Sequence, residues 1–186
     1  MTYVYWAVVN RSKDGLMYLV THGADPNKIF DPTGIQFADI PNILYGSSPV
    51  AVAAKLEDPW FLRYLAEHGG DINLVNPISG QSPLVEALAS NRRENVRYLI
   101  SRGANLNTID SIGNTPLAMA IGTQKFDIAY ELLVAGADPK IPLARNGTTV
   151  LTRLRHTNIP DPPQFEWRQK VIRLLEEQGL DVANGP

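Results

Sequence analysis

Apolar residues recur along this chain at a helical spacing, in blocks that each end at a glycine. Four residues before each of these glycines stands a leucine, and seven residues before it stands a second apolar residue. Residues three apart share one face of a helix, so the pattern predicts an amphipathic helix in every block. The leucines are Leu19, Leu65, Leu99, Leu132 and Leu175, and the second set is Leu16, Leu62, Val96, Ala129 and Ile172.

The glycine that ends each block belongs to a recurring phrase, which reads His-Gly-Ala-Asp-Pro-Asn in its first copy. A glycine after an apolar helix is the usual residue to adopt the left-handed conformation that ends a helix. A basic residue just before it, such as His22 or His68, complements the C-terminal end of the helix dipole. We therefore expect these histidines to be exposed helix caps. The copies lie at 22–27, 68–73, 102–107, 135–140 and 178–183.

A second phrase, Ser or Thr followed by proline and an apolar residue, keeps a fixed register with the first. It begins at Ser48, Ser82, Thr115 and, in a weaker form without proline, Thr149, so it recurs every 33 or 34 residues. The hydroxyl caps free N–H groups at a helix start, and proline in the first helical turn loses no hydrogen bond. Each copy therefore predicts the start of another helix, which precedes the glycine-terminated one.

Together the two phrases resemble the ankyrin family, whose repeat of about 33 residues carries Thr-Pro-Leu early and Gly-Ala-Asp late. The resemblance covers nearly the whole chain. It implies an all-α ankyrin-repeat solenoid of about five helix–turn–helix units with two loop insertions, in which stacked repeats share one core. We expect a single domain over residues 1–186. Its repeats fall at approximately 3–27, 44–73, 78–107, 111–140 and 145–183, and its insertions at approximately 28–43 and 155–166.

The two ends of the array differ from its middle. Three residues before its glycine, the last block carries Glu176 where earlier blocks carry apolar residues, as expected of a C-terminal capping repeat. The first block lacks the preceding turn and the Thr-Pro phrase. It is either an N-terminal capping repeat or the start of a piece cut from a longer protein. The second interpretation is slightly favoured, because Met1 stands directly at a helix start.

Both insertions depart from the family pattern. The first is apolar and includes Phe30, Ile35 and Phe37. A solvent-exposed loop is normally polar, so this segment either folds back onto the stack, which we favour, or contacts a partner. The second insertion holds three prolines between positions 159 and 163. We expect it to be an extended, stiff spacer that is not helical; a Pro-rich ligand motif is the alternative.

The histidine that ends the family's Thr-Pro-Leu-His phrase is also missing. In the family this histidine ties adjacent repeats together by hydrogen bonds. Its absence puts the polar ordering between repeats in doubt, although not the fold. The four equivalent positions in this chain are Ala51, Val85, Ala118 and Thr152.

Composition narrows the function classes. The chain is 44% hydrophobic and 19% charged, as in ordinary globular proteins, and it has no apolar run long enough to span a membrane. Its net charge of −2 argues against a nucleic-acid partner, because such proteins usually carry a basic stripe. It contains no cysteine, which excludes disulfides and Cys-based zinc sites. No signal peptide is visible, and both the cytoplasm and the bacterial periplasm remain open.

No constellation of catalytic residues is found in the sequence. The turns before Ser48 and Ser82 only superficially resemble the nucleophile elbow of hydrolases. No glycine-rich phosphate loop is followed by Lys-Ser or Lys-Thr, and the three histidines do not stand at metal-ligand spacing. We therefore predict that the protein is not an enzyme and that it needs neither a cofactor nor a metal.

The ankyrin resemblance implies that a partner protein binds at the turn tips and on the concave face of the first helix of each repeat. Ile78 and Ile112 stand out, because apolar residues on a turn tip need cover; contact between neighbouring tips is the alternative. The first helices should also offer Lys55, Leu56, Ser90 and His156. The candidate partner-binding residues are Tyr45, Ser47, Ile78, Ser79, Gln81, Glu86, Ser111, Ile112, Asn114, Met119, Thr123, Arg145, Asn146 and Arg153, with Phe30, Ile35 and Phe37 of the insertion.

These observations lead to a functional expectation. We expect a non-enzymatic protein–protein interaction module that is monomeric when free. In its sharper form it is a bacterial immunity or inhibitor protein, which binds and blocks a toxin or effector enzyme such as a secreted phospholipase. The alternative is a regulatory or scaffolding ankyrin adaptor, either by itself or as a fragment of a larger protein.

Overall fold

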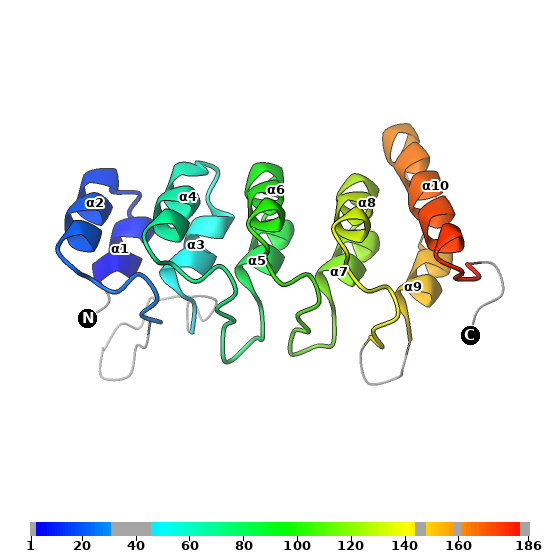
Figure 1. The fold of residues 1–186 in the computed structure, drawn as a ribbon, viewed down its shortest axis with the longest axis horizontal. Coiled ribbons are helices and arrows are strands. Elements are labelled where there is room, and N and C mark those ends of the chain that lie inside the picture. Colours follow the sequence, from blue (N-terminus) through cyan, green and yellow to red (C-terminus); the bar gives the residue numbers. More distant parts are fainter. Residues whose placement is uncertain (1–2, 31–45, 144–147, 158–160, 183–186) are drawn as a thin grey trace. The chain divides into compact units, whose positions relative to one another are not determined.

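The computed structural model describes residues 3–30, 46–143, 148–157 and 161–182. In these ranges the regular structure is helical, apart from one isolated β-bridge between Leu143 and Thr148, and the helices follow each other in pairs (Figure 1). The predicted all-α class of stacked helix pairs is confirmed. The bounds are α1 Tyr3–Val9, α2 Lys13–Thr21, α3 Pro49–Lys55, α4 Trp60–Glu67, α5 Pro83–Ala89, α6 Arg93–Ser101, α7 Pro116–Gly122, α8 Phe126–Val134, α9 Val150–His156 and α10 Pro162–Glu177.

The chain divides into two compact units, which are described separately. The N-terminal unit spans 1–104 and holds α1 to α6, and the C-terminal unit spans 105–186 and holds α7 to α10. We call α1, α3, α5, α7 and α9 the first helices and their successors the second helices. In the N-terminal unit α1 packs against α3 and α3 against α5; in the C-terminal unit α7 packs against α9 and α8 against α10. The expectation of a single domain stays a prediction.

The first helices begin as the sequence predicts. The hydroxyl oxygen of Ser48 accepts a hydrogen bond from the backbone N–H of Ala51 at the start of α3. Ser82, Thr115 and Thr149 do the same at the starts of the next three first helices. Proline occupies the first turn of α3, α5 and α7. The hydroxyl cap and the proline thus fix where each of these helices starts.

The second helices end at the predicted glycines. Gly69 follows α4 with a φ of 87°, and the four equivalent glycines also have positive φ. Just before it, Nδ1 of His68 lies 2.8 Å from the carbonyl oxygen of Tyr64, and His22 makes the same contact with Tyr18 at 2.7 Å. Both histidines are exposed. Their predicted role as surface caps is confirmed.

The predicted apolar stripe forms the core of both units. Leu65, Leu99 and Leu132 are fully buried. Two predicted members of the stripe are only half-buried, Leu19 in α2 and Ile172 in α10. In α10 Val171 is buried in place of Ile172, while Leu175 is buried as predicted. At the N-terminal end, Phe30 is buried and stacks on Tyr5, with 4.7 Å between ring centroids. The described end of the first insertion therefore folds back onto α1, as favoured.

Polar contacts between repeats are present although the family histidine is missing. In the N-terminal unit, Nδ2 of Asn27 donates to the carbonyl oxygen of Gly69 at 2.8 Å, and its Oδ1 accepts from the N–H of Asp71 at 2.6 Å. In the C-terminal unit, Oδ1 of Asn107 accepts from the N–H of Asp138 at 2.9 Å. Asparagines at the ends of the glycine phrases therefore order neighbouring repeats, which removes the doubt raised by the sequence.

The second insertion is shorter than expected. Helix α9 continues to His156, and α10 begins at Pro162 and runs for 16 residues. The prediction that both Pro162 and Pro163 are non-helical is wrong, because proline is compatible with the first turn of a helix. The added turn of α10 has a structural role: Oε1 of Gln164 accepts from the N–H of Phe126 at 2.8 Å. Gln164 thereby caps α8, whose own N-terminal residue provides no side-chain cap.

Candidate functional site

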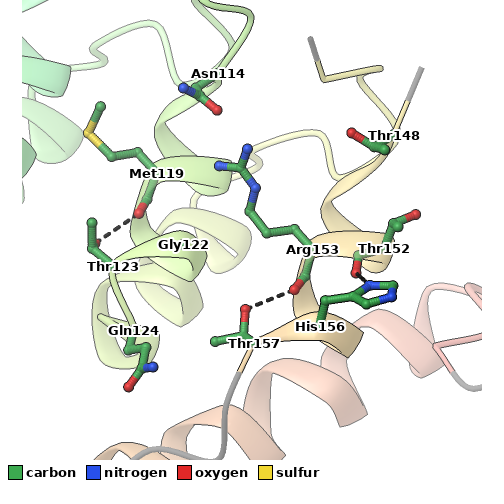
Figure 2. A pocket seen from close by; sticks show the side chains of 10 residues that line it. All are labelled: Asn114, Met119, Gly122, Thr123, Gln124, Thr148, Thr152, Arg153, His156 and Thr157. Atoms are coloured by element: carbon green, nitrogen blue, oxygen red, sulfur yellow. Dashed lines mark hydrogen bonds between the residues drawn. The ribbon is translucent and has the colours of Figure 1, made fainter. Parts of the chain in front are cut away.

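A groove of about 650 Å³ lies on the first helices α7 and α9 of the C-terminal unit (Figure 2). The sequence predicted Met119, Thr123, Arg153 and His156 on this face and Asn114 at the neighbouring turn tip, and the structure brings all five together. The predicted register of the first helices places these side chains correctly. The lining residues are Asn114, Met119, Gly122, Thr123, Gln124, Thr148, Thr152, Arg153, His156 and Thr157.

Arg153 carries the positive charge of this groove. It stands four residues after the capping Thr149 and reaches from α9 across to α7 (Figure 2). Its Nη1 donates to the carbonyl oxygen of Ala118 at 3.0 Å and would lie 3.3 Å from a Cβ atom at Gly122. The bare glycine therefore makes room for the guanidinium, and the carbonyl fixes its direction.

The polar side chains beside Arg153 are tied to their own helices. The hydroxyl of Thr157 donates to the carbonyl oxygen of Arg153 and that of Thr123 to Met119, both at 2.8 Å. Nδ1 of His156 lies 2.7 Å from the carbonyl oxygen of Thr152. Because a carbonyl only accepts, Nδ1 carries the proton and Nε2 remains available. The groove thus has a preformed polar wall.

The corresponding face of the N-terminal unit has a different charge arrangement. Glu86 occupies the position equivalent to Arg153, four residues after the capping Ser82. Its carboxylate lies 3.2 Å from Nζ of Lys55 on the preceding first helix, and the residue is 5% exposed. The expectation that Glu86 is exposed is wrong, because the Lys55 ammonium and the packing of α3 against α5 cover it.

The turn tips hold two exposed isoleucines. Ile78 is 69% exposed and Ile112 is 71% exposed. Each sits in a turn built around a buried polar side chain. Oδ1 of Asn76 accepts from the N–H of Ile78 at 2.9 Å, and Oδ1 of Asp110 accepts from the N–H of Ile112 at 3.1 Å. The turns therefore fix the backbone that carries both isoleucines, while most of the surface of each side chain is open to solvent.

The other predicted tip residues vary in exposure. Ser111 is exposed, and Ser79 and Gln81 are half-buried. Ser47 is buried, and its hydroxyl oxygen lies 3.3 Å from Nδ2 of Asn76. Ser47 is therefore part of the turn interior. The sequence-based prediction that it lies on the surface of the tip is wrong. Five predicted residues lie outside the described residues: Ile35, Phe37, Tyr45, Arg145 and Asn146.

Sequence reasoning missed a smaller hollow of about 300 Å³ in the N-terminal unit, lined in part by Arg11, Asp58 and Phe61. Nζ of Lys13 lies 2.7 Å from the carboxylate of Asp58. Hydrogen bonds from the Lys13 ammonium and from the Trp60 backbone N–H lower the pKa of Asp58. A signal existed in the sequence, because Lys13 begins one second helix and Asp58 precedes the next.

Among the described residues, no group of three or more His, Asp or Glu side chains is placed to hold a metal ion. In the same part of the chain, no helix is both long enough and apolar enough to cross a membrane.

Comparison with known proteins gives two matches. A family model described as ankyrin repeats in three copies matches residues 50–143, half of the chain. The matched segment includes both isoleucine tips and Met119 but ends before Arg153. The chain is also similar to Protein PhlB of Serratia liquefaciens, with 33% identity over 120 residues. This similarity covers 64% of the chain and 47% of PhlB, so the chain spans about half the length of that relative.

Proposed function

Because the chain belongs to the ankyrin-repeat family, we propose that it acts by binding another protein and not by catalysis. The observation that carries the proposal is the pair of exposed isoleucines at the turn tips, Ile78 and Ile112. An exposed isoleucine gains about 1.5–3 kcal/mol when a partner buries it fully. Two such residues at equivalent turn tips are suited to contact a second protein.

The turns that carry these isoleucines support the proposal further. Asn76 and Asp110 fix the backbone of each tip through the hydrogen bonds described above. A side chain presented on a fixed turn loses little conformational freedom on binding, which leaves more of the burial energy for affinity. The ordered polar groove of the C-terminal unit adds a second contact area of the same preformed kind.

In its sharper form, the proposed function is that of a bacterial immunity or inhibitor protein, which binds and blocks a toxin or effector such as a secreted phospholipase. The similarity to a protein of the bacterium Serratia liquefaciens supports a bacterial setting. Inhibition then requires no chemistry from this chain, because a bound repeat surface blocks an active site by occupying its entrance.

The test is to mix the full chain with the products of neighbouring genes and, separately, with a secreted bacterial phospholipase, and to measure both complex formation and enzyme activity. We expect a stable complex and loss of the enzyme's activity. Ile112→Asp should weaken the complex about tenfold or more, since each 1.4 kcal/mol of lost binding energy is a factor of ten. Ile78→Asp should act in the same direction.

The matched control is Val134→Asp, because Val134 is an apolar residue of the C-terminal unit that is 63% exposed and lies on a second helix. It should leave the complex unchanged. A complex that forms without inhibition would favour the adaptor alternative over the inhibitor. If no complex forms with any neighbouring gene product, the proposed function is wrong in its sharper form. If both isoleucine variants bind as tightly as wild type, the tips are not the contact surface.

A further inference from the structure

The two units treat charge on their first helices in opposite ways. In the N-terminal unit, Glu86 lies four residues after the capping Ser82 of α5. It faces Lys55, which lies seven residues after Ser48, the capping residue of the preceding first helix. In the C-terminal unit the same two positions hold Arg153 and Gly122. The first arrangement closes an ion pair within the protein. The second places the guanidinium of Arg153 over a glycine, which has no side chain that could pair with its positive charge.

No acidic group neutralises Arg153 within the described part of the C-terminal unit. The described ion pairs Lys13–Asp58, Lys55–Glu86 and Arg63–Glu94 all lie in the N-terminal unit, and none of them includes Arg153. The groove contains no Asp or Glu among its lining residues. The short segments 144–147 and 158–160 contain none in their sequence either. Only one of the guanidinium's five N–H donors has a described acceptor, the carbonyl oxygen of Ala118.

We propose that the groove on α7 and α9 is the docking site for an acidic side chain of the partner protein, an Asp or Glu whose carboxylate pairs with Arg153. This proposal rests on the proposed protein-binding function and names the chemistry of one contact. Charge complementarity carries it. A planar guanidinium presents parallel N–H donors that fit the two oxygens of a carboxylate.

The surroundings favour a carboxylate over a phosphate group. The other cation on α9, Arg155, is held at the C-terminus by the carbonyl oxygens of Val182 and Asp181, at 2.6 and 3.3 Å. Among the described residues the groove contains one guanidinium, which matches the single charge of a carboxylate, whereas phosphate sites usually gather several charged or backbone donors. The groove lining also includes Met119 and several threonines, whose carbon atoms are available to the methylene stem of a partner's Glu or Asp.

The direct test is an NMR titration of the isotope-labelled full chain with capped glutamate, a glutamate blocked at both ends as amides. Capped glutamine is the isosteric neutral control, and inorganic phosphate is the competing anion. We expect saturable shifts in the millimolar range at the signals of Gly122, Thr123 and Arg153, with capped glutamate but not with capped glutamine. Arg153→Gln should abolish them, and Arg153→Lys should weaken them because the ammonium lacks the planar fork.

A second variant tests the groove without touching Arg153. Gly122→Glu supplies the missing internal acid and reproduces the Lys55–Glu86 pair with the signs exchanged. We expect it to fold, because the nearest described atom to a Cβ at this position is the flexible end of Arg153 and the backbone is ordinary helix. It should abolish the response to capped glutamate, while the matched control Gly122→Gln should retain it. Thermal melting of both variants checks that they fold.

Three results would overturn the proposal. These are the absence of any saturable shift, an unchanged response in Gly122→Glu, and a response to phosphate that is as tight as the response to capped glutamate. With an identified partner, Arg153→Gln should weaken the complex about tenfold to a hundredfold, as for the loss of a charged hydrogen bond. If a complex forms and its affinity is unchanged by Arg153→Gln, the proposed carboxylate contact is wrong while the proposed protein-binding function stands. The absence of any complex counts against the proposed function instead.

Discussion

The first helices of the two units show what a repeat architecture does with one position. Glu86 and Arg153 stand on the same turn of equivalent helices. Glu86 is buried against Lys55, whereas Arg153 lies in an open groove, where its guanidinium has one described hydrogen bond, to the backbone carbonyl of Ala118. The N-terminal unit therefore uses this position for cohesion between repeats, and the C-terminal unit leaves it available.

The difference teaches that the fold and the binding surface are specified by different residues of the same repeat. The buried stripe and the helix caps are similar in both units and follow from local rules of helix formation. The side chain four residues after the cap has no such constraint and varies freely between repeats. Its role depends on the residue that the preceding repeat places opposite it.

The largest expected effect tests what the two units share. Leu99→Ala in the N-terminal unit and Leu132→Ala in the C-terminal unit each remove a fully buried leucine of the stripe. Each should lower the free energy of unfolding by about 2–5 kcal/mol, because a cavity is left in a packed core. Chemical denaturation followed by circular dichroism measures the loss. If Leu99→Ala melts like wild type, the repeat register is wrong.

The next effect tests where the units differ. Lys55→Met leaves the nearly buried carboxylate of Glu86 without its partner and should cost about 1–3 kcal/mol of stability. Arg153→Met removes only a hydrogen bond to a backbone carbonyl and should cost about 1 kcal/mol or less. Adding Glu86→Gln to Lys55→Met should recover part of the loss, since no buried charge then remains unpaired. Equal costs for Lys55→Met and Arg153→Met would remove the contrast between the units.

Most of the fold could be predicted from the sequence, because its determinants are local. Ser48 and Gly69 begin and end their helices for reasons that involve only nearby backbone groups. The burial of Glu86 could not be predicted in this way, since it depends on Lys55 in another repeat. The helical prolines at the start of α10 were misjudged for a related reason. A proline run suggests an extended chain, yet Pro162 fits the first turn of a helix.

The candidate site shows the same division. The repeat register placed Met119 and Arg153 on one face, which the structure confirms as one groove. The register carries no information about the carbonyl of Ala118, which directs the guanidinium. The signal for the ion pair was available, because aligning the four capping residues sets Glu86 against Lys55 and Arg153 against Gly122. Finding this ion pair in the sequence requires a comparison of neighbouring repeats, because neither repeat shows it alone.

A smaller effect compares the turns that join first and second helices. Asn91 in the N-terminal unit and Gln124 in the C-terminal unit both adopt left-handed backbone, with φ of 58° and 57°. This conformation costs most side chains about 1–2 kcal/mol, but asparagine tolerates it better than glutamine. Gln124→Gly should therefore raise the melting temperature more than Asn91→Gly does. Gln124→Ala keeps the strain and should give no gain, which separates backbone relief from loss of the side chain.

The smallest effect concerns the surface pair between Lys13 and Asp58 in the N-terminal unit. The pKa of Asp58 is lowered by the Lys13 ammonium and the Trp60 N–H. Its contribution to stability is therefore present above the pKa of an unfolded aspartate, about 3.9. It is lost as the pH falls through the lower value of the folded state. Because both side chains are nearly half exposed, solvent screening limits the contribution to about 0.5 kcal/mol.

Asp58→Asn keeps an acceptor for the Trp60 N–H but removes the charge. The variant should be less stable than wild type at neutral pH, and the two proteins should be equally stable in strong acid. A constant difference across the acid range, measured by urea unfolding at low salt, would show that the ion pair does not stabilise the N-terminal unit.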